Sequence, residues 1–254
     1  MGKNKLKKFA DMEKFRCVLQ YPREELLRLG FPHTGRWNGD VFAAPAPIVL
    51  ELGCGRGEYT VGLAKSDPAR NFIGLDIKGA RMWTGARQVE EEGISNAAFL
   101  RCEIENIEHF FAPGEVDEIW ITFPDPQMQK VRKRLTSTRF LGLYRKVMRP
   151  GGVVNLKTDS PFLFEYTRRL VEINGFETLA CTDDLYESGL VDPVTSIKTY
   201  YEQQWLSRGK RIKLISFRLP AEGQLVEPEA DDIERDDYRA IPRPSFPGMS
   251  ENKL

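Results

Sequence analysis

The stretch that decides the fold runs from Ile48 to Thr60 and reads Ile-Val-Leu-Glu-Leu-Gly-Cys-Gly-Arg-Gly-Glu-Tyr-Thr. Its first five residues are apolar except for Glu51, which predicts a buried strand, and a helical pattern follows Gly57. Three glycines therefore connect a strand to a helix. In a doubly wound α/β sheet such a loop lies at the carboxyl end of its strand, where ligands bind.

Short apolar runs alternate with helical patterns along most of the chain. The predicted strands are 48–52, 71–75, 97–100, 116–122 and 153–156, and the predicted helices are 58–65, 79–92, 135–148 and 161–174. Strands separated by helices imply a mostly parallel sheet with helices on both faces. Alternating residues over 211–219 predict one more strand late in the sheet, which we expect to be antiparallel.

Composition divides the chain into three parts. Residues 1–45 form a basic arm and lead-in, 46–219 form the α/β domain, and 220–254 form an acidic tail that contains several prolines. Hydrophobic residues make up 41% of the chain, enough for one full-sized core. The tail has nine acidic and four basic residues, and its small apolar surface cannot offset the entropy of ordering it, so we expect disorder there.

Residue counts exclude several classes of protein. The four cysteines form no Cys-x-x-Cys pair and there are only two histidines, which argues against a disulfide framework, a metal site and a Ser-His or Cys-His hydrolase. No apolar run approaches the roughly 18 residues of a membrane span. The basic N-terminus is followed by no apolar export segment. We therefore expect a cytoplasmic protein with no membrane segment.

Acidic residues at the strand ends predict the ligand of the glycine loop. The loop does not match a dinucleotide fingerprint, because the third glycine comes one position early and Glu58 takes its place. The Glu51 carboxylate would repel a pyrophosphate but attract a sulfonium or an ammonium. Asp76 ends the next strand, where it could accept two ribose hydroxyl protons, and Glu103 follows the third strand, near an adenine. The expected ligand is S-adenosylmethionine, bound by Glu51, Gly53, Gly55, Gly57, Asp76 and Glu103.

Three later segments predict a second ligand at the same edge. Phe123-Pro-Asp-Pro126 follows the fourth strand, and its prolines should hold Phe123 and Asp125 extended in a rigid loop. Asp159 follows the fifth strand, where it either faces a ligand or caps the next helix. Thr199-Tyr-Tyr-Glu202 is expected in a long loop. Carboxylates at these positions suit guanine, which offers N1-H and an amino group side by side.

Taken together, these motifs resemble the bacterial tRNA (guanine-N7-)-methyltransferase family over about residues 48–219. The matching segments are Leu-Glu-Leu-Gly-Cys-Gly-Arg-Gly, Gly-Leu-Asp-Ile, Phe-Pro-Asp-Pro with Lys-Arg-Leu-Thr, Lys-Thr-Asp and Thr-x-Tyr-Glu, in that order. The resemblance implies a Rossmann-like class I methyltransferase sheet. It also implies methyl transfer from S-adenosylmethionine to N7 of a guanine in the variable loop of tRNA.

The resemblance also implies roles for single residues. Glu51, Asp76 and Glu103 would contact the cofactor, and Asp125 would be the residue usually called catalytic. The guanine would be held by Asp159, Thr199, Tyr201 and Glu202. This chain departs from the family pattern at Gln127, where the family has Trp, and at Gln129, where it has a basic residue. In this segment we expect Gln129 and Lys130 to approach the substrate.

Charge supports a nucleic-acid partner. Residues 129–149 contain eight basic residues and no acidic one, and 198–218 add six against Glu202 alone. Such single-sign stretches predict phosphate contacts with a nucleic acid, which the resemblance implies is tRNA. We expect the protein to be a monomer or a homodimer. Guanine N7 has a free lone pair, so its methylation needs no general base. Three rivals stay open: an NAD(P) oxidoreductase, a class I methyltransferase for another nucleic acid or a small molecule, and an RNA-binding module without activity.

Overall fold

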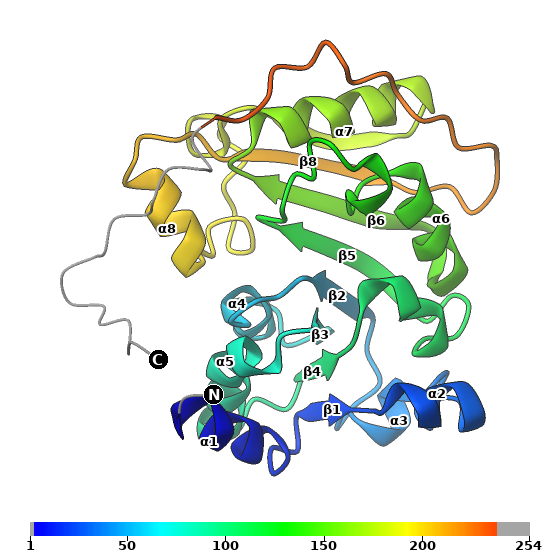
Figure 1. Cartoon of the computed structure of the whole chain (residues 1–254), viewed down its shortest axis with the longest axis vertical. Helices are drawn as coiled ribbons and strands as arrows, with labels where there is room; N and C mark the ends of the chain where they lie inside the picture. Colours follow the sequence, from blue (N-terminus) through cyan, green and yellow to red (C-terminus); the bar gives the residue numbers. More distant parts are fainter. Residues whose placement is uncertain (1–2, 238–254) are drawn as a thin grey trace.

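The computed structural model describes residues 3–237, and its centre is one sheet of eight strands in the order β1-β4-β3-β2-β5-β6-β8-β7 (Figure 1). The neighbours from β1 to β6 pair in parallel, whereas β8 is antiparallel to both β6 and β7. The strands are β1 Val18–Gln20, β2 Ile48–Leu52, β3 Asn71–Asp76, β4 Ala97–Arg101, β5 Val116–Thr122, β6 Met148–Thr158, β7 Thr178–Thr182 and β8 Lys213–Arg218. The predicted α/β class and the late antiparallel strand are confirmed.

Helices cover both faces of the sheet because neighbouring strand residues point to opposite sides. Val49 packs with α4 and α5 on one face, and Leu50 packs with α6 and α7 on the other. The helices are α1 Lys3–Met12, α2 Arg23–Leu29, α3 Trp37–Asp40, α4 Glu58–Ser66, α5 Gly79–Glu92, α6 Thr138–Val147, α7 Pro161–Ile173 and α8 Tyr200–Leu206, with short 3₁₀ helices at Ile104–His109, Val131–Lys133 and Leu185–Glu187. No helix within residues 3–237 is long and apolar enough to span a bilayer.

The strand order reverses direction at β2, which places a crevice at the carboxyl edge of the sheet. β2 pairs with β3 on one side and with β5 on the other, so the chain moves outward from β2 in both directions. Ligands bind at such a switch point in open α/β sheets. The loops after β2, β3, β4, β5 and β6 all begin at this edge.

The two ends of the described chain are more ordered than the sequence predicts. Within the expected basic arm, β1 pairs with β4, and α1 lies along α5 with the Trp83 indole donating to Asp11 at 3.0 Å. Residues 220–237, expected to be disordered, pack along α6 and α7, with Ile233 buried. The physical reason is that the acidic residues find hydroxyl and arginine partners on these helices. The remaining part of the expected tail, 238–254, lies outside the described residues.

Candidate active site

A cavity of about 920 Å³ opens at the carboxyl edge of the sheet. Residues predicted to bind the cofactor and residues predicted to bind the substrate share its wall. The predicted residues on the wall are Glu51, Gly53, Gly55, Asp76, Glu103, Asp125, Thr199 and Tyr201. The predicted residues Gly57, Gln129, Lys130, Asp159 and Glu202 do not line it.

Glu51 is a buried carboxylate at the base of the cavity. One oxygen accepts from the Thr60 backbone N-H at 2.8 Å and from its hydroxyl at 2.5 Å, and the other accepts from the Thr122 hydroxyl at 2.7 Å. Burial raises the pKa of Glu51 to about 7, although these bonds oppose the rise. A cation in the cavity would favour the charged form of Glu51.

Asp76 connects the glycine loop to the start of α5. Its two oxygens accept from the backbone N-H of Gly55 at 2.9 Å and of Lys78 at 2.7 Å. Each oxygen keeps a further lone pair for a ligand. Gly53 has a φ of 75°, a left-handed conformation that a glycine adopts without strain. This conformation brings the Gly53 N-H to the carbonyl of Leu75 at 2.8 Å, so the loop folds back onto β3.

Gly57 has a packing role in this structure. A Cβ at Gly57 would lie 2.5 Å from the Phe99 ring, and a Cβ at Gly85 would lie 2.9 Å from the Gly57 Cα. The two glycines therefore let α5 approach the glycine loop closely. The sequence assigned Gly57 to the cofactor because it is the third glycine of the loop.

The substrate loop, residues 123–134, follows β5 and carries Asp125 into the cavity wall. Phe123 has a φ of 49°, so the prediction of an extended Phe123 is wrong. Its N-H continues the pairing of β5 with β6 by donating to the Lys157 carbonyl at 2.9 Å, and the chain then turns sharply. Asp125 is exposed and accepts from the Gln127 N-H at 3.0 Å. A left-handed non-glycine residue before proline is costly, and such strain clusters at functional loops.

Arg134 holds the other end of the substrate loop. It is only 4% exposed, stacks on the rings of Phe162 and Tyr166, and donates to the carbonyls of Gln127 and Met128. Arg134 therefore cannot bind a phosphate in this structure, although it belongs to the basic stretch predicted to do so.

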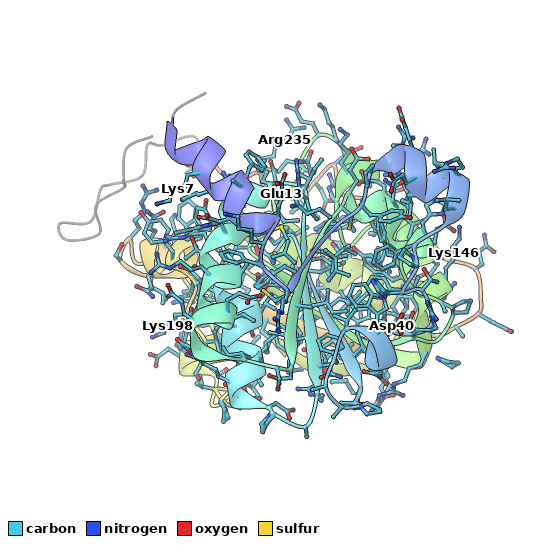
Figure 2. All side chains as sticks on the ribbon, turned by 90° about the horizontal axis from the view of Figure 1, so that it is seen from below. Lys7, Glu13, Asp40, Lys146, Lys198 and Arg235 are labelled. Atoms are coloured by element: carbon cyan, nitrogen blue, oxygen red, sulfur yellow. The ribbon has the colours of Figure 1, made fainter. Side chains whose placement is uncertain are left out.

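Other members of the basic stretch are also separated by the fold. Lys146 pairs with Glu108, and Arg149 pairs with Asp117 at the amino end of β6, on the edge opposite the cavity. Figure 2 shows Lys146 and Lys198, which belong to the two different basic stretches, toward opposite sides of the molecule. Arg132 and Lys133 are exposed on the substrate loop, and Lys133 lines the cavity. Lys133, which we did not predict as a site residue, is therefore the lysine of the substrate loop that lines the cavity.

Basic residues on the cofactor side were also missed. Arg56 lies within the glycine loop, and Lys78 and Arg81 stand at the start of α5; all three line the cavity. The sequence could have indicated them, because Arg56 directly follows Gly55 and the other two come within five residues after Asp76. They supply positive groups for a carboxylate, such as that of a bound amino acid.

Asp159 is buried below the cavity wall. It is 1% exposed, and its charge opposes the lowering of the Lys213 pKa that burial causes. The expected alternative role as a helix cap is wrong, because Ser160 is the N-cap of α7 and accepts from the Leu163 N-H at 2.9 Å.

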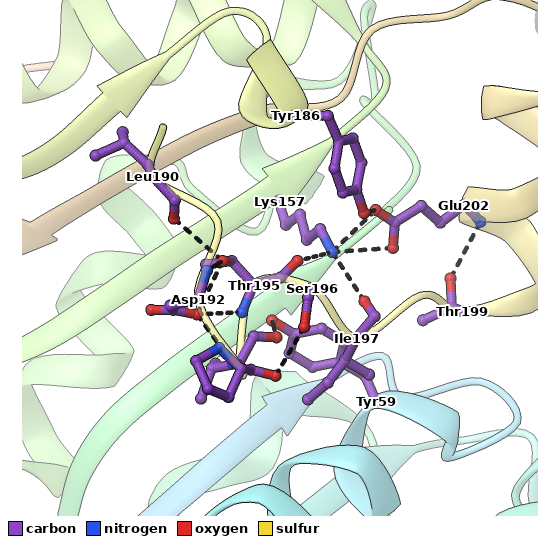
Figure 3. A network of polar contacts seen from close by, with 12 residues as sticks. Tyr59, Lys157, Tyr186, Leu190, Asp192, Thr195, Ser196, Ile197, Thr199 and Glu202 are labelled. Atoms are coloured by element: carbon purple, nitrogen blue, oxygen red, sulfur yellow. Dashed lines mark hydrogen bonds and ion pairs between the residues drawn. The ribbon is translucent and has the colours of Figure 1, made fainter. Parts of the chain in front are cut away.

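Glu202, in the first turn of α8, belongs to a buried network of polar contacts (Figure 3). Neither Glu202 nor Lys157 is exposed, and their charged atoms are 2.9 Å apart. Tyr186 donates its hydroxyl to Glu202 at 2.6 Å, and Lys157 also donates to the carbonyls of Thr195 and Ile197. The Thr199 hydroxyl accepts from the Glu202 N-H and caps α8, which corrects the expectation of a loop here. Only Thr199 and Tyr201 of this motif face the cavity.

The chain is similar in sequence to known proteins over most of its length. A family model described as "Putative methyltransferase" matches residues 45–215. A Bacteroides thetaiotaomicron protein named tRNA (guanine-N(7)-)-methyltransferase is 55% identical over 253 residues, the full length of both chains. A Porphyromonas gingivalis protein of the same name is 59% identical over 236 residues, which cover 91% of this chain and 96% of the relative.

Solved structures agree on the fold. The 16S rRNA methyltransferase KamB is 16% identical, with a TM-score of 0.54, and the match covers 80% of this chain and 95% of that one. At this identity the likeness concerns the fold alone. The full-length sequence similarity and the matched family model carry the assignment: the chain belongs to the tRNA (guanine-N(7)-)-methyltransferase family.

Proposed function

We propose that this chain transfers the methyl group of S-adenosylmethionine to N7 of a guanine in the variable loop of tRNA. The observation that carries the proposal is the single cavity in which Glu51 and Asp76 share a wall with Asp125. The names of the relatives support guanine N7 and tRNA as the acceptor. A tRNA substrate also favours a cytoplasmic location.

The cofactor side of the cavity fits S-adenosylmethionine, which supplies a methyl group on a cationic sulfur. Buried Glu51 lies where a positive charge would stabilise its ionised form. Asp76 and Glu103 offer carboxylate oxygens for ribose and adenine, and Arg56, Lys78 and Arg81 offer cations for a carboxylate. The donor set therefore matches each polar part of this cofactor.

The substrate side presents Asp125, Thr199 and Tyr201 to the same space. Guanine N7 already carries a lone pair, so no residue has to remove a proton before attack. Asp125 can accept from the N1-H edge of the base and stabilise the positive charge that develops on the purine ring. Holding N7 in line with the methyl group is the main task of these residues.

Tritiated-methyl transfer to unmodified bulk tRNA tests the proposal. We expect label in 7-methylguanosine after nuclease digestion of the product. Label in another nucleoside would assign the chain to a different acceptor atom, and binding of tRNA without label would favour an inactive RNA-binding module.

Affinity for S-adenosylmethionine should rise with pH through about 7. The raised pKa means that Glu51 is largely neutral below 7, and a cationic ligand needs it ionised, so binding should release protons near that pH. Calorimetry at several pH values in two buffers measures both effects. Glu51→Gln should weaken binding and abolish the pH dependence, whereas Glu103→Gln, at an exposed position on the same wall, should keep it. An unchanged pH dependence in Glu51→Gln would contradict the assignment.

Binding of tRNA should weaken steeply with salt, and the substrate loop should contribute to the slope. Arg132→Gln and Lys133→Gln should each reduce the slope of log affinity against log salt by about one. Arg149→Gln is the matched control, because Arg149 pairs with Asp117 at the opposite edge of the sheet. Equal effects of all three substitutions would show that the loop has no special part in phosphate binding.

A further inference from the structure

The segment after β8 runs back along α7 to the edge of the sheet that holds the cavity. We call residues 220–237 the C-terminal strap (Figure 1). It bonds to Asn174 at the end of α7 through Val226, to Arg169 in the middle through Asp232, and to Ser160 at the start of the helix through Asp236. The strap therefore ends beside the substrate loop.

Asp236 joins two parts of the active-site edge. Its carboxylate accepts from the Ser160 hydroxyl at 2.5 Å and from the Phe162 N-H at 3.2 Å, so it adds to the N-terminal cap of α7. Its own N-H donates to the sulfur of Met128 at 3.2 Å. Met128 lines the main cavity and lies three residues after Asp125.

A second path runs from the strap to the same loop. Glu227 accepts from the hydroxyls of Thr138 and Tyr166. The Tyr166 ring lies under the Arg134 guanidinium, 4.5 Å from the ring centroid, and Arg134 holds the carbonyls of Gln127 and Met128. A smaller cavity of about 400 Å³ separates the strap from the loop between these two paths.

We propose that the C-terminal strap is a positioning element of the active site, with Asp236 fixing the substrate loop against the start of α7. This inference rests on the proposed function of Asp125, because the benefit of a fixed loop is a fixed carboxylate. A displacement of about 1 Å at a reacting group can cost about 100-fold in rate. Met128 and Arg134 are the two places where the strap, directly or through Tyr166, restrains the loop that carries Asp125.

The hydrogen bonds of Asp236 indicate that it acts by positioning the substrate loop rather than by its negative charge. Both oxygens of Asp236 accept from donors at the start of α7, which fixes the position of the carboxylate, and its charge also acts on Lys213. Asp232, which carries the same charge, pairs with Arg169 on the exposed side of the same helix. Replacing each of these two acids in turn therefore tests whether the position of an acid on the strap matters.

Three variants of the full chain test the proposal: Asp236→Ala, Asp236→Asn and Asp232→Ala. Asp236→Ala should lower kcat for tRNA methylation about tenfold or more and leave S-adenosylmethionine affinity within about twofold. Hydrogen exchange should become faster in residues 123–134. Asp236→Asn should retain most activity, because an amide can accept from Phe162 N-H and donate to the Ser160 oxygen. Asp232→Ala, which removes only the contact to Arg169 in the middle of α7, should lower kcat much less than Asp236→Ala does.

Two outcomes would overturn the inference while the proposed function stands, provided that the wild type forms 7-methylguanosine. One is an unchanged kcat and unchanged exchange of the substrate loop in Asp236→Ala. The other is tighter tRNA binding in Asp236→Ala, Asp236→Asn and Asp232→Ala alike, which would show that the strap acts through its charge. A wild type that forms no 7-methylguanosine would contradict the proposed function itself.

Discussion

Replacement of Asp125 by alanine is expected to reduce methyl transfer by about 100-fold or more, with nearly unchanged affinity for S-adenosylmethionine. The reason is its place in the cavity. Asp125 is exposed on the substrate loop, whereas Glu51 and Asp76, which we propose hold the cofactor, line the cavity from β2 and β3. Single-turnover transfer to tRNA and calorimetry with the cofactor measure the two effects separately.

Asp125→Asn separates the charge of this residue from its effect on loop shape. The amide oxygen can keep the bond from the Gln127 N-H, so the turn should survive. If the carboxylate acts by its charge or as the acceptor for the guanine edge, asparagine should be almost as damaging as alanine. Glu105→Gln, which changes another exposed acid on the same wall, is the control and should be nearly silent. Wild-type rates in both Asp125 variants would show that this residue only stabilises the turn.

Lys157→Met is expected to lower the free energy of unfolding by about 3–5 kcal/mol. The substitution would leave the Glu202 carboxylate buried beside the Tyr186 hydroxyl without its cation. Burial lowers the pKa of Lys157 and raises that of Glu202, so each charge depends on the other. Lys157 also holds the carbonyls of Thr195 and Ile197, which would lose a donor. Urea unfolding monitored by tryptophan fluorescence measures the change.

The double variant Lys157→Met, Glu202→Gln is the control for this prediction. Removing both charges avoids an uncompensated buried ion, so the double variant should be more stable than Lys157→Met alone. Equal stability of the two variants would show that Glu202 becomes neutral in the folded protein once Lys157 is removed. A Lys157→Met variant as stable as the wild type would show that the buried pair does not stabilise the fold.

Most of the sheet could be predicted because its central strands are buried on both faces. Ile48–Leu52 is apolar except for Glu51, Val116–Thr122 contains the apolar run 119–121, and both strands appear with the predicted bounds. The edge strands β1 and β7 were missed, since β1 has only three residues and both are partly exposed, which leaves no apolar run to detect. The pairing partner, β4 or β8, decides their conformation, and pairing over such distances has no local signal.

The site was predicted where a motif fixes the backbone and missed where tertiary contacts decide. Glu51 and Asp76 end buried strands, so strand prediction alone placed them at the cavity. Thr199 to Glu202 reads as a helix start, with threonine at the N-cap and glutamate three residues later, a pattern that we assigned to a loop. Glu202 is buried because it pairs with Lys157, which is 45 residues away in the sequence.

The order of the strands also bears on how such a protein can change over time. The glycine loop and Asp76, on the cofactor side, precede β5, whereas the substrate loop and α8 follow it. Two hydrogen bonds join these halves at the cavity: Thr122 donates to Glu51, and the Tyr200 N-H donates to Glu58. Recombination between related genes within the turn before β5 would therefore exchange the acceptor side while retaining the donor side, as long as the pairing of β2 with β5 and the side-chain bonds between the halves, these two among them, are preserved.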